Sequence, residues 1–229
     1  MKSIVSLTAG AIAVALVSSA DGAMIAGWSI TTAFPTGAGN VPTGQTYSVG
    51  AADQGAQTAG SSLSSYHALA AATYTSPAGN GSQYAFSSNN WSTGDYYEAR
   101  VSTSNYANIS VSWDQARSST GPASFELIFS VDGGQNWINA ATYTVLQSGG
   151  GGAPGTWSSL TYNALYSNSQ ALAGAEDANL LIVRFRSTVG GAATGSNRID
   201  NVVISGDVVP APGAVALLAV AGLVSRRRR

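Results

Sequence analysis

The feature that most constrains the fold is a series of short runs in which apolar and polar residues alternate. The clearest run covers 125–131, where Phe125, Leu127 and Phe129 fall on one face of an extended segment. Apolar residues at every second position predict strands with one buried face. Gly, Asn, Asp and Ser bound the runs as turn residues. Similar runs cover 96–101, 109–113, 180–186 and 199–204, with shorter ones at 28–32, 83–86, 138–144 and 157–162.

About nine short strands with no helical periodicity between them predict an all-β domain, an antiparallel β-sandwich of jelly-roll type. The domain is expected over residues 21–208, which is enough chain for one buried core. Alternation places Arg184 and Arg186 on the outer face of their strand, and it sends one of Tyr96 and Tyr97 into the core. With no Cys in the chain, disulfides, zinc–thiolate sites and thiol nucleophiles are excluded.

The charged residues are few and unevenly placed. The 229 residues include 10 Lys+Arg and 11 Asp+Glu, with a formal net charge of −1. Lys2 and the four terminal arginines account for half of the basic residues, whereas every acidic residue lies within 21–207. Five arginines against eleven acids leave the middle of the chain at −6. Nucleic-acid binding, which needs basic residues clustered on the domain, is therefore excluded.

The N-terminus predicts a secretory signal peptide over residues 1–20. Met1-Lys2-Ser3 precedes an apolar run over 4–17, expected to be helical, and small residues follow at 18–20. A positive start, an apolar stretch and a small-residue cleavage site are typical of exported proteins. Cleavage is expected after Ala20, with Ala23 as the alternative, so signal peptidase and the export machinery are predicted partners.

The C-terminus, 209–229, combines a proline motif, an apolar helix and a basic end. The apolar stretch 213–224 is shorter than the roughly 18–20 residues that cross a bilayer, and the arginines suit a cytoplasmic end at the inner membrane. The segment resembles the PEP-CTERM sorting signal of exported bacterial proteins, which a membrane-embedded exosortase processes. Ala211 replaces that family's central Glu, so cleavage by a divergent sorting enzyme and retention as an anchor both stay open. The motif comprises Val209, Pro210, Ala211, Pro212, Arg226, Arg227, Arg228 and Arg229.

Part of the body also resembles domains that precede such tails in exported bacterial proteins. The resemblance implies a sandwich fold and an extracellular address, but no reaction. Residues 198–202 are similar to the last strand of these sandwiches. The matching pattern lies in 79–82, 87–91, 94–98, 109–117, 121–127 and 130–137.

One turn within this pattern matches the Asp-box, a β-hairpin signature familiar from sialidases. It consists of Ser130, Asp132, Gly134 and Trp137. Asp132 is expected to cap N–H groups of the turn, the glycines to supply positive φ, and Trp137 to pack back over the turn. A single box in a small domain predicts a folding device rather than a sialidase site.

Aromatic residues near polar ones suggest a glycan-binding patch, since sugars bind on exposed Trp and Tyr faces. Asn89, Asn90 and Asp95 lie beside these aromatics, whereas Trp113 and Trp157 are expected in the core. The candidate glycan contacts are Trp91, Tyr96, Tyr97 and Tyr106.

Calcium is the metal that this chain suits best, because its potential ligands are oxygen atoms. Sugar-binding jelly rolls often hold a structural calcium with an Asp of the last strand. By that resemblance the candidate ligands are Asp200, Asn201 and Asp53. The competing interpretation is that Asp200 caps a strand or pairs with Arg198. No other cofactor is predicted.

Hydrolase chemistry is disfavoured. The available acids include Asp114 and Glu176/Asp177, but Glu98 and Glu126 fall on outward strand positions where solvation is the default. His67, the sole histidine, has no acidic residue near it in sequence, although a Ser-His-Asp triad through it stays open.

We therefore expect an exported, surface-sorted, non-enzymatic protein of the cell envelope or extracellular matrix, structural or adhesive in role. The alternative is a carbohydrate-binding module that recognises extracellular polysaccharide, and a hydrolase ranks third. The expected location is the cell surface or the medium, with transient C-terminal anchoring.

Overall fold

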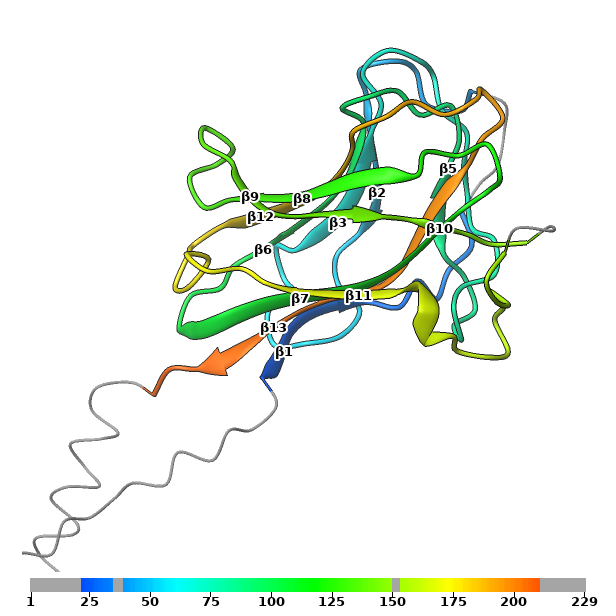
Figure 1. Ribbon diagram of the computed structural model, residues 1–229. Helices are drawn as coiled ribbons and strands as arrows, with labels where there is room; N and C mark the ends of the chain where they lie inside the picture. Colours follow the sequence, from blue (N-terminus) through cyan, green and yellow to red (C-terminus); the bar gives the residue numbers. More distant parts are fainter. Residues whose placement is uncertain (1–21, 35–38, 150–152, 211–229) are drawn as a thin grey trace, which may run out of the picture.

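The computed structural model describes residues 22–34, 39–149 and 153–210, and these form an all-β structure of two sheets (Figure 1). The signal segment and its expected helix lie outside the described residues, as does the C-terminal tail after Pro210. Nowhere in the described ranges is there a helix long and apolar enough to span a membrane. The described part contains one short 3₁₀ turn, η1, at Ala164–Tyr166.

The first sheet has seven strands and is built around two long ones, β7 (Tyr106–Arg117) and β13 (Asn197–Val208). The order is β10-β7-β13-β5-β4, with β1 paired along β13 and β11 paired along β7. All pairs are antiparallel except β10 with β7. The shorter strands are β1 (Ala23–Trp28), β4 (Tyr74–Thr75), β5 (Phe86–Ser88), β10 (Leu146–Gln147) and β11 (Ser167–Ala171).

The second sheet has six strands in the order β2-β3-β6-β12-β8-β9, all antiparallel. In this sheet Arg184 of β12 lies opposite Glu98 of β6, and Tyr66 of β3 lies opposite Tyr96 of β6. The strands are β2 (Thr46–Gly50), β3 (Ser62–Tyr66), β6 (Tyr96–Val101), β8 (Ser124–Ser130), β9 (Ile138–Thr144) and β12 (Leu181–Ser187).

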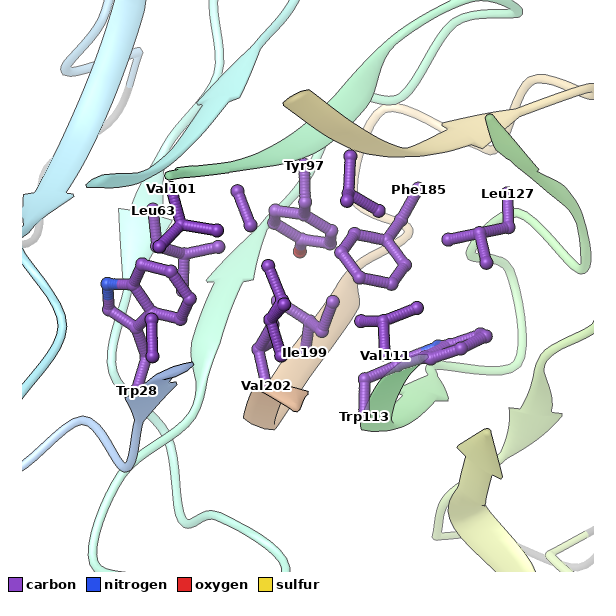
Figure 2. Packing of buried hydrophobic residues seen from close by; sticks show 14 of the residues in the cluster. Trp28, Leu63, Tyr97, Val101, Val111, Trp113, Leu127, Phe185, Ile199 and Val202 are labelled. Carbon is purple, nitrogen blue, oxygen red and sulfur yellow. The ribbon is translucent and has the colours of Figure 1, made fainter. Parts of the chain in front are cut away.

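The two sheets share one apolar core, which makes the structure a β-sandwich. Figure 2 shows Tyr97 and Phe185 of the six-stranded sheet facing Val111 and Ile199 of the seven-stranded sheet. Every second residue of β12 is inaccessible to solvent, as alternation along the strand requires. Burial of these faces supplies the kind of stability that disulfides supply in many small secreted domains.

The longest predicted strands are confirmed. The limits of 96–101 and 138–144 coincide with β6 and β9, and the other long runs fall within or one residue from β7, β8, β12 and β13. The prediction of a strand at 157–162 is wrong, because these residues form a loop in which Trp157 is half-buried and donates to the carbonyl of Ala78. The run at 28–32 is shifted, since β1 ends at Trp28, and 83–86 overlaps β5 only at Phe86.

The two ends of the described chain lie together. Ala23, the first residue of β1, is paired with Gly206 near the end of β13. The two strands therefore leave the sandwich at the same end, as the blue and orange strands of Figure 1 show.

Candidate functional site

A row of aromatic rings and an arginine crosses the outer face of the six-stranded sheet. Alternation in β6 turns Tyr97 into the core and leaves Tyr96 and Glu98 on the outer face. The strand register then sets Tyr66 beside Tyr96 and Arg184 beside Glu98. We call Tyr66, Tyr96, Arg184 and Trp137 the aromatic–arginine row.

Members of the row contact one another in sequence. The ring centroids of Tyr66 and Tyr96 are 5.4 Å apart with an interplanar angle of 22°. The guanidinium carbon of Arg184 lies 3.9 Å from the ring centroid of Tyr96 and 4.2 Å from that of Trp137. Arg184 thus contacts two aromatic rings, an arrangement that cation–π attraction stabilises.

Each arginine on this face donates from its Nε atom to a glutamate carboxylate. Glu98, whose side chain is only 5% exposed, accepts from Nε of Arg100 and from Nε of Arg184, each at 2.6 Å. Glu126 accepts from Nε of Arg186 at 2.7 Å. Charge-assisted hydrogen bonds of this length fix the direction of each guanidinium plane. The buried Glu98 carboxylate is compensated by two cations.

The turn between β8 and β9 delivers Trp137 to the row. Ser130 Oγ donates to Asp132 Oδ1 at 2.7 Å, and the N–H of Gly134 donates to Ser130 Oγ at 2.9 Å. The backbone N–H of Asn136 and the Ser130 hydroxyl stabilise the Asp132 carboxylate and lower its pKa to about 2. Trp137 Nε1 donates to the Gly134 carbonyl at 3.0 Å. The Asp-box sequence therefore builds a folding device that also positions a ring beside Arg184.

Of the four candidate glycan contacts, only Tyr96 lies on an outer face. Trp91, Tyr97 and Tyr106 are 2%, 0% and 8% exposed and belong to the core. Trp91 packs edge-on against Tyr97 with their centroids 4.9 Å apart. These three rings offer no surface to a sugar, which corrects the expectation from sequence. The rings that accompany Tyr96 are Tyr66 and Trp137 instead.

Asp200 and Asn201 belong to a buried polar cluster with Asp114. Asp200 is directly opposite Asp114 in the β13–β7 pair, and both are buried. Asp200 Oδ2 accepts from the N–H of Asn80 at 2.7 Å and from Ser82 Oγ at 2.6 Å. Burial raises the pKa of Asp200 to about 6. Its Oδ1 atom is buried and has no hydrogen-bond partner in the described structure.

The third candidate calcium ligand, Asp53, is not part of this cluster. Its carboxylate accepts from the backbone N–H of Ser29 at 3.2 Å and from the Ser29 hydroxyl at 2.7 Å. Asn201 instead donates to Asp114 Oδ2 at 2.7 Å, and Arg198 donates to Ser148 rather than to Asp200. The described ranges contain no group of three His, Asp or Glu side chains placed to hold a metal. Calcium at Asp200 and Asn201 stays a prediction.

The structure brings His67 to partners that the sequence did not reveal. His67 Nδ1 lies 3.1 Å from Asp95 Oδ2, and His67 Nε2 lies 3.1 Å from Ser88 Oγ. This is the order of contacts in a Ser-His-Asp triad. However, Ser88, His67 and Asp95 are 1%, 2% and 0% exposed, and His67 packs edge-on against Trp91. With Ser88 Oγ enclosed, the arrangement acts as a buried hydrogen-bond network that joins β5 to two loops.

The other acids considered for hydrolysis are occupied in turns or ion pairs. Glu176 accepts from the N–H of Gly174 and Asp177 from that of Asn105. Glu98 and Glu126 do lie on outward positions, where they bind the arginines described above.

A separate depression of about 200 Å³ lies at the edge of the sandwich beside β1 and β2. Its aromatic lining residues are Trp28 and Phe34. Trp28 is buried and donates through Nε1 to the Gly50 carbonyl. Ile30, also in this lining, has a φ of 48°, which is unusual for a β-branched residue. Phe34 is partly buried and packs edge-on against Tyr47 and Phe86, so both aromatic rings of this depression also pack against the core.

Comparison with known proteins gives distant structural similarity only. No protein-family model and no curated protein matches the chain. The K1 cleaved adhesin domain of Lys-gingipain from Porphyromonas gingivalis is 12% identical with a TM-score of 0.44, over 79% of this chain and 97% of that one.

Two carbohydrate-binding modules are similarly distant. TmCBM61 in complex with beta-1,4-galactotriose is 12% identical with a TM-score of 0.39, over 65% of this chain and 90% of that one. The CBM22-1 xylan-binding domain from Paenibacillus barcinonensis is 12% identical with a TM-score of 0.35, over 75% and 99%. At these TM-scores the similarity assigns no role to any residue of this chain.

Proposed function

We propose that this domain is a non-catalytic binding module for extracellular polysaccharide on a jelly-roll-like sandwich. Its binding surface is the outer face of the six-stranded sheet. The observation that supports the proposal is the aromatic–arginine row, in which Arg184 lies against both Tyr96 and Trp137. Sugar rings bind where aromatic surface lies beside a few fixed polar groups, and this face provides both.

Sugar rings would bind at the two ends of the row, on Tyr66 and on Trp137. Tyr96 contacts both Tyr66 and Arg184, whereas Tyr66 and Trp137 each contact one member of the row. Tyr66 and Trp137 therefore keep ring surface for a ligand. Polar atoms lie between them, including the guanidinium groups and the Glu126 carboxylate, which accepts from Asn139 at 3.0 Å. A chain of sugars laid across the strands would contact rings at both ends and polar groups between them.

Binding studies with the full chain test this function. Tyr66→Ala and Trp137→Ala should each weaken polysaccharide binding about tenfold, the loss expected for one aromatic contact. Trp157→Ala is the matched control, because Trp157 is also half-buried and also faces an arginine, Arg198 at 5.6 Å, but lies outside the row. Equal losses in all three variants, or no polysaccharide bound by the parent chain, would refute the proposal.

We also propose that the chain is exported and sorted through its two ends, with 1–20 as signal peptide and 209–229 as sorting tail. The support is the order of features in the tail, a proline motif, an apolar stretch and four arginines. Deleting Arg226–Arg229 should divert the protein to the medium or to degradation. Cell fractionation with immunoblotting measures the distribution, and unchanged surface display would contradict the sorting role.

A further inference from the structure

The arginines of the outer face share a feature that narrows the ligand class. Arg100 and Arg184 each make one hydrogen bond, from Nε to Glu98. Arg186 uses Nε and Nη2 on a single oxygen of Glu126. Within the described part of the chain, the Nη atoms of Arg100 and Arg184 and Nη1 of Arg186 donate to no protein acceptor. These side chains are 42%, 22% and 39% exposed.

The same three residues hold most of the positive charge of the body. Only five arginines lie between Lys2 and the C-terminal cluster, against eleven acids. Three of the five are on this face, whereas Arg117 and Arg198 extend from the other sheet. The acids nearest in sequence to the row are Asp95 and Glu98, beside Tyr96. Asp95 is buried and accepts from the N–H groups of Ala68 and Ser92, and Glu98 binds Arg100 and Arg184. The outer face of the six-stranded sheet thus carries three of the five arginines of an acidic body, against the two carboxylates, Glu98 and Glu126, that bind them.

These arginines are also held in place before any ligand binds. Nε is anchored on a carboxylate in each, and Arg184 is further fixed by the rings of Tyr96 and Trp137. A guanidinium held through Nε keeps Nη groups for a ligand, which are both Nη groups in Arg100 and Arg184 and Nη1 alone in Arg186. Those groups can donate in parallel to the oxygens of an oxyanion. Fixing the side chain beforehand lowers the entropy lost on binding.

We propose that the polysaccharide bound on this face is anionic, carrying carboxylate or sulfate groups that contact the Nη atoms of Arg100, Arg184 and Arg186. This inference rests on the proposed function and specifies its ligand. The rings of Tyr66 and Trp137 contact the sugar, and the arginines contact its charged substituents. Charge complementarity favours this ligand on this face over the acidic remainder of the body.

The test measures the binding of the full chain to four polymers over a range of salt. Polygalacturonate presents carboxylates, dextran sulfate presents sulfates, and unmodified dextran and neutral galactan present neither. We expect binding to at least one anionic polymer at least tenfold tighter than to both neutral ones, with affinity falling as salt rises. The arm that binds better distinguishes carboxylate from sulfate.

Substitutions then separate a specific contact from general charge. Arg100→Gln and Arg186→Gln should each weaken anionic binding about tenfold, whereas lysine at the same positions should recover only part of the loss, since it lacks the paired donors. Glu176→Gln, at an exposed turn, removes one negative charge. Added to Arg100→Gln, it restores the net charge of the parent chain. If Arg100 contacts the ligand directly, this double variant should bind no better than Arg100→Gln alone.

The outcomes distinguish the proposal of an anionic ligand from the proposal of polysaccharide binding on which it rests. Equal affinity for neutral and anionic polysaccharide, without salt dependence, would overturn the anionic ligand and leave polysaccharide binding in place. Recovery of affinity by Glu176→Gln would overturn the local contact. Poly-glutamate, measured in the same way, is an anionic polymer without sugar rings, and binding equal to that of the anionic polysaccharide would overturn the requirement for a sugar. Failure to bind any of the four polymers would overturn both proposals.

Discussion

At the scale of single residues, Glu98 is the more buried of the two carboxylates on the outer face and the one that pairs with two arginines. It is nearly buried, yet it faces outward by alternation, and the two arginines on its oxygens offset its loss of hydration. Glu126, with a more exposed side chain, serves one arginine. Comparing the two carboxylates therefore measures how burial changes the contribution of an ion pair to the free energy of unfolding.

We predict that Glu98→Gln lowers the free energy of unfolding by roughly 1–3 kcal/mol, because two partly buried guanidinium groups lose their anchor. Glu126→Gln should have a smaller effect, within about 1 kcal/mol, since its pair is closer to solvent. Urea unfolding followed by tryptophan fluorescence provides both values. A larger loss from Glu126→Gln would show that the buried double pair is not the main contact.

Asp200 gives a prediction for pH. Burial raises its pKa to about 6 from the ordinary 3.8, so between these values the folded state binds more protons than the unfolded state. The contribution of this group to stability is therefore greatest near pH 4 and declines as pH rises through 6. Asp200→Asn should remove this decline and raise the melting temperature at pH 7, by an amount on the order of a few degrees.

The same substitution tests calcium. If the cluster of Asp200, Asp114 and Asn201 takes calcium, the metal should stabilise the parent chain at pH 7, and Asp200→Asn should abolish that gain. Thermal melts with calcium and with a chelator measure the difference. Identical melting curves in both conditions would remove the metal from consideration at this cluster.

The buried Ser88–His67–Asp95 network predicts an absence of serine-hydrolase reactivity. A fluorophosphonate probe should not label the folded chain, because Ser88 Oγ is enclosed. His67→Ala should nevertheless lower the free energy of unfolding by about 2–4 kcal/mol, since it leaves a cavity beside Trp91 and removes the buried contacts of the imidazole with Ser88 and Asp95. Labelling that Ser88→Ala abolishes would show an accessible nucleophile and contradict the non-catalytic proposal.

At the scale of elements, the sequence was sufficient where one strand face is continuously apolar. In β8 and β12 the inward positions are apolar, although Ile128 and Ile182 are also apolar at outward positions. The predicted strands are found within one residue of their limits. Strand β3 was not predicted because its sequence, Ser-Leu-Ser-Ser-Tyr, has serines at buried positions. There the tertiary hydrogen-bonding environment, rather than side-chain hydrophobicity, decides the strand.

The candidate site was predicted only in part, for a physical reason. Alternation indicated that Arg184 and Arg186 face outward and that Tyr96 and Tyr97 face opposite ways. The row itself depends on the pairing of β3 with β6 and of β6 with β12, and register between distant strands is not visible in a single strand's pattern. The contact of Trp137 with Arg184 depends in addition on how the turn folds back.

The β8–β9 turn supplies a matched pair of glycine substitutions. Gly133 and Gly134 have φ of 76° and 90°, so alanine at either position should lower the free energy of unfolding by about 1 kcal/mol. Only at Gly134 would the new methyl group touch Trp137, at 3.4 Å, whereas Gly133 has open space. Gly134→Ala should therefore also weaken polysaccharide binding, and Gly133→Ala should not. Equal binding by the two variants would show that the turn does not set the Trp137 ring.

At the scale of the whole molecule, the sandwich separates its candidate surface from its connection to the rest of the chain. The aromatic–arginine row lies on the six-stranded sheet, while β1 and β13, which lead to the two termini, belong to the seven-stranded sheet. The core between the sheets is continuous. A ligand on one sheet and a tether on the other would thus engage opposite faces of one rigid body.

The pairing of β13 has a mechanical consequence. This strand is bonded along one edge to β7 and along the other to β5 and β1. A pull applied at Pro210 along the strand axis loads the hydrogen bonds on both edges in shear, so many must break together rather than one after another. In a flowing medium, a module tethered through β13 would resist extraction by drag on the polymer it holds. β13, the last strand of the domain, would then carry the mechanical load between the bound polymer and the tether.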